Sequence, residues 1–266
     1  FERVTPIITS HREIKSSFEI DIVKEACKIT EKGLLRVLDF IQPDVWEYEI
    51  EAEVTHEFII NKSNGHAYNP IFASGQNACI LHYINNNQQC KNGDLILMDF
   101  GAEYANYASD LTRTIPVNGR FSKRQKEVYD SIRSVMVRAI DMMNVGTLLD
   151  EFNKEIGKLI ESELIQLGLL SRLEIKKQDS DNPLYKKYFP HGTAHFLGMD
   201  VHDVGNRYSP FKSGMVLTCE PGIYIPEEGI GIRIENDILI SKDGPIDLMS
   251  SIPIETEEIE ELMNKN

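Results

Sequence analysis

The chain has 266 residues, and its 28 basic and 42 acidic residues leave a net charge of −14. Such an acidic chain is not expected to bind nucleic acid, and it has no apolar run near the ~18 residues that suggest a membrane span. The four cysteines have no paired spacing. They argue against a disulfide framework or a zinc knuckle and indicate a reducing, cytoplasmic setting.

The first half is predicted to contain two helices and then strands, after about a dozen irregular residues. Ser16 and Glu19 form a capping box that opens the first helix, and Pro43 breaks it. A second amphipathic segment ends near Gly65, and residues 68–83 are expected to form short strands and loops. The predicted inner positions follow helical spacing: Val23, Cys27, Thr30, Leu34 and Leu38, then Ile50, Val54, Phe58 and Ile59.

Residues 95–116 are predicted to form a hairpin of two strands, each carrying an acidic residue. With its centre between Tyr104 and Ala105, Asp99 and Asp110 would lie directly opposite each other on one face. Their β-carbons would then be about 4.5–5.5 Å apart, where like charges repel. Either a shared proton or a multivalent cation could neutralise the pair.

The second half repeats the order of two helices followed by strands. Ser122 and Gln125 form another capping box, Gly146 ends that helix, and Thr147 and Asp150 are expected to cap the next one. The predicted buried positions are Val128, Ile132, Val135, Ala139 and Met143, then Phe152, Ile156, Leu159, Ile160 and Leu164. The repeated order indicates an α+β domain with an antiparallel sheet, with helices on one face and a site on the other.

The remaining segments are a polar surface excursion over 171–188, two strands over 216–225 and 230–240, and a closing helix over 255–263. Glu220 and Glu235 interrupt the two strands, which otherwise look buried. His195 lies in the stretch HGTAHFLGMDVHD, which holds three histidines, and His82 lies in ILHY.

Each of these residues alone has an ordinary interpretation, as an acid on a solvated strand face or a hydrogen-bonded core histidine. Together, four carboxylates and a histidine would be very costly to bury without partners. Two divalent cations would balance the four negative charges of Asp99, Asp110, Glu220 and Glu235. Oxygen ligands with one imidazole suit Mn²⁺, Co²⁺, Zn²⁺ or Fe²⁺, and paired metals ~3.5–4 Å apart can activate water for hydrolysis.

From about Lys15 onward the chain resembles the catalytic domain of the pita-bread metallopeptidases (M24-type). The motifs that carry the resemblance are MDFGAEYANYASDLTRT, HGTAHFLGMDVHDVG, LTCEPGIYI and GIGIRIENDI, in family order. GQNACILHY, DVHDVG and GIRIE bring it closest to the Xaa-Pro aminopeptidases (aminopeptidase P), with prolidase as the nearest rival. The resemblance implies two pseudo-symmetric helix–helix–strand halves and a curved antiparallel sheet that encloses a dinuclear metal site.

The resemblance also implies a role for each matching metal-site residue. Asp99 would chelate one metal, and Asp110 and Glu235 would bridge both. His195 and Glu220 would complete the shell of the second metal. Two divalent ions are expected as cofactors, with Mn²⁺ as the first choice and Co²⁺, Zn²⁺ or Fe²⁺ as alternatives.

The catalytic groups implied by the resemblance are His82, His202 and Glu220. The two histidines would position the scissile carbonyl and stabilise the gem-diolate, and Glu220 would carry the proton of the attacking water to the leaving nitrogen. The residues expected to bind substrate are His82, His191, His202, Tyr224 and Arg233. Of these, His191, Tyr224 and Arg233 would shape the pocket around proline.

The implied function is a metal-dependent aminopeptidase whose metal-bridging hydroxide cleaves the bond between an N-terminal residue and a following proline. Its partners would be short peptides with proline second, and the sequence leaves room for a homo-oligomer. The alternatives are an Xaa-Pro dipeptidase (prolidase), a catalytically silent binding protein of the same fold, and a hydrolase in which Asp99 and Asp110 share a proton.

Domain organisation follows from the same resemblance. Residues 1–14 are expected to be a lead-in or linker, and residues 15–266 the catalytic domain. Aminopeptidases P and prolidases carry a further N-terminal domain, which this chain does not contain.

Overall fold

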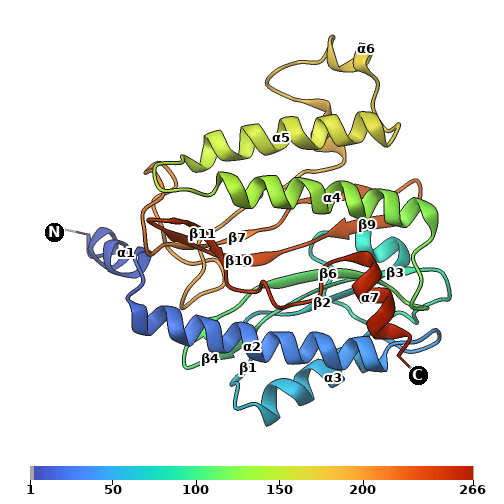
Figure 1. Cartoon of the computed structure of the whole chain (residues 1–266), viewed down its shortest axis with the longest axis horizontal. Helices are drawn as coiled ribbons and strands as arrows, with labels where there is room; N and C mark the ends of the chain where they lie inside the picture. Colours follow the sequence, from blue (N-terminus) through green and yellow to red (C-terminus); the bar gives the residue numbers. More distant parts are fainter. Residues whose placement is uncertain (1–2, 266) are drawn as a thin grey trace.

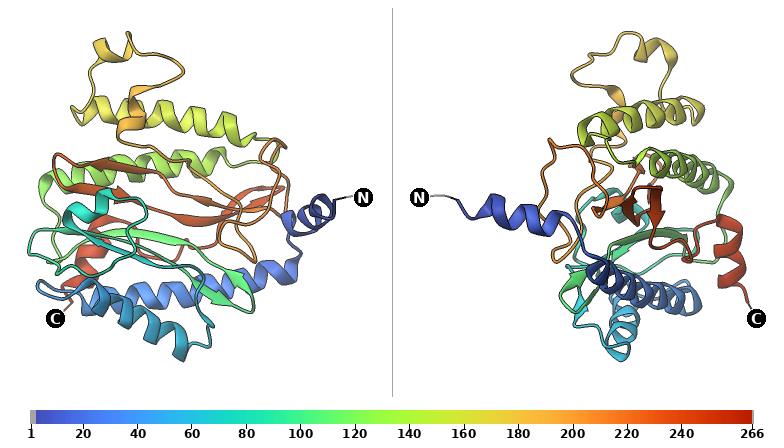
Figure 2. Two further views of the ribbon diagram at one scale, coloured as in Figure 1. Left: turned by 180° about the vertical axis from the view of Figure 1, so that it is seen from behind. Right: turned by 60° about the vertical axis from the view of Figure 1, so that its left-hand side comes forward.

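Two pairs of helices enclose a set of antiparallel strands (Figure 1). The computed structural model describes residues 3–265. The first pair is α2 (Ser17–Phe40) with α3 (Glu47–Ile60), and the second is α4 (Lys123–Met142) with α5 (Leu149–Gln166). Each pair is followed by strands, so the predicted order of helix, helix and strands occurs twice, and a back view shows the strands held between the pairs (Figure 2).

The strands of the first half form two antiparallel sheets, ordered β1-β4-β5 and β2-β3-β6. Those of the second half are ordered β11-β10-β7 and β8-β9. Their bounds are β1 Gly65–His66, β2 Ile71–Ser74, β3 Leu95–Phe100, β4 Ala102–Tyr104, β5 Tyr107–Ala108, β6 Leu111–Pro116, β7 Val216–Cys219, β8 Gly222–Ile225, β9 Ile230–Arg233, β10 Asn236–Ser241 and β11 Gly244–Asp247. The shorter elements are α1 Thr5–Glu13, η1 Gly75–Cys79, α6 Arg172–Ile175, η2 Leu184–Lys187 and the closing helix α7 Thr256–Met263.

The two capping boxes read from the sequence are confirmed. The Ser16 side chain accepts from the Glu19 amide at the start of α2, and Ser122 does the same with Gln125 at the start of α4. The cap predicted for α5 is wrong. Leu148 occupies its N-cap position without a side-chain bond, and the Thr147 hydroxyl instead donates to the carbonyl of Met142 at 3.0 Å.

Two further expectations about the helices are wrong. The first dozen residues are not irregular, because Thr5–Glu13 forms α1, with Pro6 in its first turn, where a missing amide proton costs least. Ile59 is 62% exposed rather than on the inner side of α3. The other predicted inner positions of α2 and α3 are buried.

The two long strands predicted in the second half are each broken at their acidic residue. Glu220 and Pro221 separate β7 from β8, and Ile234 and Glu235 separate β9 from β10. Proline has no amide proton for the ladder. The breaks place both glutamates at the ends of strands, where they can turn into the space between the two halves.

The halves are joined where β6 meets the β9–β10 break. The amide of Glu235 donates to the carbonyl of Thr112 at 3.0 Å, forming an isolated antiparallel bridge. Arg113, next to it, is fully buried, and its guanidinium donates to the carbonyls of Thr112, Glu235 and Pro253. This junction fixes where residues of the two halves meet.

The packing of His66 in β1 predicts that the stability of the fold depends on pH. Its ring lies 4.9 Å from that of Phe58, its Nε2 is 2.8 Å from the Thr55 hydroxyl, and burial lowers its pKa to about 4. An unfolded histidine has a pKa near 6.5, so the unfolded state binds more protons between about pH 4 and 6.5. The folded state is therefore destabilised by acid in this range, by at most about 3 kcal/mol for this residue.

His66→Gln is expected to reduce this loss. Urea denaturation of the metal-free protein at pH 7 and pH 4.5 measures the free energy of unfolding of both variants. The drop on acidification should be smaller for His66→Gln than for the unchanged protein. An equal drop in both would show that His66 does not contribute.

Candidate active site

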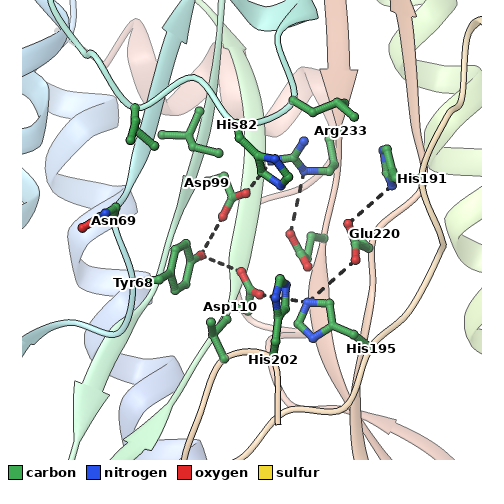
Figure 3. A pocket seen from close by; sticks show the side chains of 15 residues that line it. Tyr68, Asn69, His82, Asp99, Asp110, His191, His195, His202, Glu220 and Arg233 are labelled. Atoms are coloured by element: carbon green, nitrogen blue, oxygen red, sulfur yellow. Dashed lines mark hydrogen bonds and ion pairs between the residues drawn. The ribbon is translucent and has the colours of Figure 1, made fainter. Parts of the chain in front are cut away.

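The five residues expected to bind metal come together from both halves of the fold (Figure 3). Ligand atoms of Asp110, His195 and Glu235 all lie within 4.8 Å of one another. His195 Nε2 is 3.3 Å from Asp110 Oδ2 and 3.7 Å from Glu220 Oε1. Asp99 joins the cluster from β3, through shared hydrogen-bond partners.

The predicted register of the hairpin that carries Asp99 and Asp110 is wrong. Asp99 pairs with Thr112 rather than with Asp110. The turn lies one residue later than predicted, at Ala105 and Asn106, which both have a positive φ. Asp110 is consequently the diagonal neighbour of Asp99 instead of its direct partner. Since side chains alternate along a strand, the two acids still share a face.

Tyr68 joins the two aspartates and was not anticipated from the sequence. Its hydroxyl oxygen lies 2.6 Å from Asp99 Oδ1 and 2.5 Å from Asp110 Oδ1. A single hydroxyl proton can be donated to only one of them at a time. No spacing or motif marked Tyr68, because its contact depends on how the loop before β2 folds back over β3.

Arg233 provides positive charge beside these acids. Its Nη2 donates to Asp99 Oδ2, its Nη1 donates to the Tyr224 hydroxyl at 2.8 Å, and its Nε lies 4.0 Å from Glu235 Oε2. The Thr112 hydroxyl also donates to Glu235 Oε2, at 2.6 Å. The guanidinium is therefore held inside the cluster by fixed partners.

The acidic side chains of the site outnumber the positively charged groups that could neutralise them. Burial raises the pKa of Glu220 to about 7, against the lowering effect of His195 and Arg233. Burial, followed by the neighbouring carboxylates, raises the pKa of Glu235 well above its usual range. Burial also raises the pKa of Asp99, against the lowering effect of Arg233. For His195, burial would lower the pKa, but Asp110 and Glu220 outweigh it and raise the pKa to about 9.

These features fit a site for divalent cations. The donor set is four carboxylates and one imidazole, which suits first-row divalent metals. Burial and the neighbouring acids raise the pKa values of Glu220 and Glu235 because they make the negative charges costly, and bound cations would remove that cost. Asp99, Asp110, His195, Glu220 and Glu235 are the residues that would hold them.

A cavity of about 440 Å³ opens over this cluster. Besides the five clustered residues, its polar lining consists of Tyr68, Asn69, His82, His191, His202 and Arg233, and its apolar lining of Ile71, Leu81, Ile84 and Val201. The ring of His202 meets that of His195 edge-on, with centroids 4.3 Å apart. His82 also lines the cavity, on the loop that follows η1 (Figure 3).

Tyr224 is the one predicted site residue that does not line the cavity. It is 3% exposed and lies behind the lining, where its hydroxyl contacts Arg233 and, at 2.8 Å, His191 Nε2. His191 Nδ1 lies 3.6 Å from Glu220 Oε2. A continuous polar chain therefore runs from Glu220 through His191 and Tyr224 to Arg233.

Comparison with known proteins places this cluster in a family. The model of metallopeptidase family M24 matches residues 21–242. The chain belongs to this family. It is 39% identical to the Xaa-Pro aminopeptidase of Haemophilus influenzae over 97% of its own length and 63% of the relative's. The chain thus spans between about half and about three fifths of the length of the curated relatives that it matches.

Solved structures of M24 relatives share the fold. Proline aminopeptidase P II from Yersinia pestis superposes with a TM-score of 0.93 at 38% identity, covering 99% of this chain and 63% of that one. Zinc-substituted Escherichia coli aminopeptidase P in complex with product gives a TM-score of 0.92 at 39% identity, covering 98% of this chain and 61% of that one. The predicted α+β pita-bread fold, with its antiparallel sheets, is confirmed.

Proposed function

We propose that this chain is the catalytic part of an Xaa-Pro aminopeptidase, which hydrolyses the bond between an N-terminal residue and a following proline. The observation that carries the proposal is the convergence of Asp99, Asp110, His195, Glu220 and Glu235 at the floor of one cavity. The relatives named above support the same activity.

Two divalent cations, with Mn²⁺ as first choice, are the proposed cofactors. When bound, such metals polarise a carbonyl and make water nucleophilic at neutral pH. Asp99, Asp110, His195, Glu220 and Glu235 would hold them. The zinc-substituted relative supports a divalent metal without identifying the one used here.

Proton transfer and the positioning of the substrate are carried out by side chains of this protein. Glu220 accepts the proton of the attacking water and delivers it to the leaving nitrogen. The nitrogen of proline must gain a proton as the bond breaks. His82 and His202, on the cavity wall, position the scissile carbonyl and the gem-diolate.

Substrate binding is assigned to two sets of residues. The apolar residues Ile71, Leu81, Ile84 and Val201 provide a surface for the apolar parts of the peptide. His191, Tyr224 and Arg233 shape the pocket around proline through their hydrogen-bonded chain. The excess of carboxylates favours a peptide with a free, positively charged N-terminus.

The test is an activity profile of the metal-loaded protein on Ala-Pro-Ala, Ala-Pro and Ala-Ala-Ala. We expect rapid cleavage of Ala-Pro-Ala, slow cleavage of the other two, and loss of activity with a chelator. Turnover of Ala-Pro alone would identify a prolidase. Bound metal without cleavage of any peptide would favour the silent binding protein, and activity insensitive to chelators would favour the carboxylate pair.

We also propose a cytoplasmic location, which rests on the four free cysteines. Three of them, Cys27, Cys90 and Cys219, are buried. Within residues 3–265, no helix combines the length and apolar character needed to cross a bilayer.

A further inference from the structure

A short segment near the start of the chain contacts the loop that carries His202 at several points. The segment consists of residues 12–15, which are the last two residues of α1 and the two that follow it, and we call it the entry strap. The loop consists of residues 198–214, and we call it the His202 loop. Figure 2 shows the N-terminal helix alongside the loops that follow residue 190.

The strap holds the loop at several points along its length. Arg12 Nη2 lies 2.7 Å from Asp200 Oδ2 and also contacts Asp203 Oδ1. Lys15 Nζ lies 3.4 Å from Asp203 Oδ2. At the far end of the loop, the Lys15 amide donates to the carbonyl of Gly214 at 2.8 Å.

Glu13 adds two contacts in the middle of the His202 loop. Its Oε1 accepts the amide of Asn206 at 2.9 Å, and its Oε2 lies 3.4 Å from Lys212 Nζ. Glu13 is only 4% exposed. The strap therefore provides partners for the amide of Asn206, the ammonium group of Lys212 and the carbonyl of Gly214 in the His202 loop.

The pair formed by Lys15 and Asp203 is the centre of these contacts. Both side chains are only 1% exposed. Gly198 makes room for them, because a β-carbon there would lie 2.2 Å from Asp203 Oδ2 and 2.9 Å from Lys15 Cε. A buried ion pair is costly to form and even more costly to break on one side, so its geometry is strongly determined.

This pair lies immediately beside His202. Asp203 is the next residue, and its amide donates to the carbonyl of Phe196 at 2.9 Å while its Oδ1 accepts the amide of Val204 at 2.9 Å. The backbone on the C-terminal side of His202 is thereby fixed. The His202 ring in turn packs against His195.

We propose that Lys15 and Asp203 are positioning residues that set the orientation of His202 in the cavity. The expected effect on catalysis rests on the proposed function, whereas the expected effect on the orientation of the His202 ring does not. It extends the working part of the catalytic domain to Arg12, three residues before the boundary expected at residue 15. Changes in the strap should act on catalysis through His202.

The kinetic test is a double-mutant cycle of Lys15→Met with His202→Ala in the metal-loaded protein, on Ala-Pro-Ala. We expect Lys15→Met alone to lower kcat about 10- to 100-fold, the size of loss that a displaced catalytic group can cause, with little change in KM and in bound metal. In the His202→Ala background it should cause no further loss. A loss of equal size in both backgrounds would overturn the proposal.

A second readout does not need activity. Ring signals of His202 in an NMR spectrum of the metal-free protein, assigned from their absence in His202→Ala, should shift or broaden in Lys15→Met, while those of the surface residue His56 stay in place. Unchanged His202 signals would refute the positioning role even if the protein cleaved no peptide. If the unchanged protein cleaves no peptide but these signals move, only the proposed function fails.

Two other variants serve as a replacement and as a control. One is used if Lys15→Met does not fold, and the other tests whether any change in the His202 loop has the same effect. Asp203→Asn preserves side-chain volume and should reproduce both effects if Lys15→Met does not fold. Arg207→Met is the matched control, because Arg207 lies in the same loop but pairs with Asp150 in an exposed contact of 3.0 Å. Arg207→Met is expected to change neither kcat nor the His202 signals.

Discussion

Replacing Asp110 with Asn is expected to abolish metal binding and peptidase activity while leaving the fold intact. Asp110 is 4% exposed and faces His195, Tyr68 and the other acids of the cluster. Asparagine has nearly the same shape and can still accept the Tyr68 hydroxyl. It has no negative charge, however, and half of its polar end is a donor that repels a cation.

The size of the effect follows from the position of Asp110 between the two halves. As the proposed bridge between metals, it would be shared by both ions, so its loss should prevent dinuclear loading rather than weaken one site. Activity should fall by at least about 10²- to 10³-fold, the range seen when one charge-stabilising group is removed. The metal-free variant should keep its fold, because the loss of one of several mutually repelling acids offsets the loss of the 3.3 Å contact between Asp110 and His195.

The measurements are the metal content after dialysis against Mn²⁺ and thermal unfolding with and without the metal. Asp130→Asn is the matched control, since Asp130 is an exposed acid that contacts Lys126 at 3.2 Å. The unchanged protein and the control should gain stability with Mn²⁺, and Asp110→Asn should not. Two metal ions retained per chain in Asp110→Asn would rule out the bridging role.

Helix starts could be predicted from the sequence because they are decided by residues three apart. The boxes at Ser16 and Ser122 require only local contacts, and both form. The start of α5 could not, because Thr147 bonds back to Met142 and Asp150 pairs with Arg207 in a distant loop. The carbonyl of Met142, five residues upstream, and the side chain of Arg207, in a distant loop, bind the groups that the local pattern assigned to the cap.

The acids of the site could be found because buried charges are conspicuous in apolar strands. Their geometry could not, because it depends on where the chain bends. The breaks at Glu220 and Glu235, and the left-handed turn at Ala105 and Asn106, determine where each acid lies. Tyr68 carried no signal, since a tyrosine in a loop acquires its role only from the two aspartates that it meets.

Replacing Arg233 with Met is expected to destabilise the metal-free protein, by about 3–5 kcal/mol as for other buried ion pairs that lose one partner. Arg233 is 4% exposed and is the only arginine or lysine side chain lining the cavity among the described residues. Its removal leaves Asp99 and Glu235 without the guanidinium that faces both. Much of this loss should be recovered on adding Mn²⁺, because the cations supply the missing positive charge and bind only the folded state.

Arg113→Met is the matched control for this rescue. Arg113 is also fully buried and would also leave a hole, but its guanidinium donates mainly to backbone carbonyls at the junction and not to the acids of the cavity. Urea denaturation with and without Mn²⁺ should therefore give a larger metal-induced gain in the free energy of unfolding for Arg233→Met than for Arg113→Met. Equal gains would mean that Arg233 is a packing residue like Arg113. A larger gain for Arg233→Met would mean that, in the metal-free chain, the guanidinium neutralises the acids that the cations neutralise when they are bound.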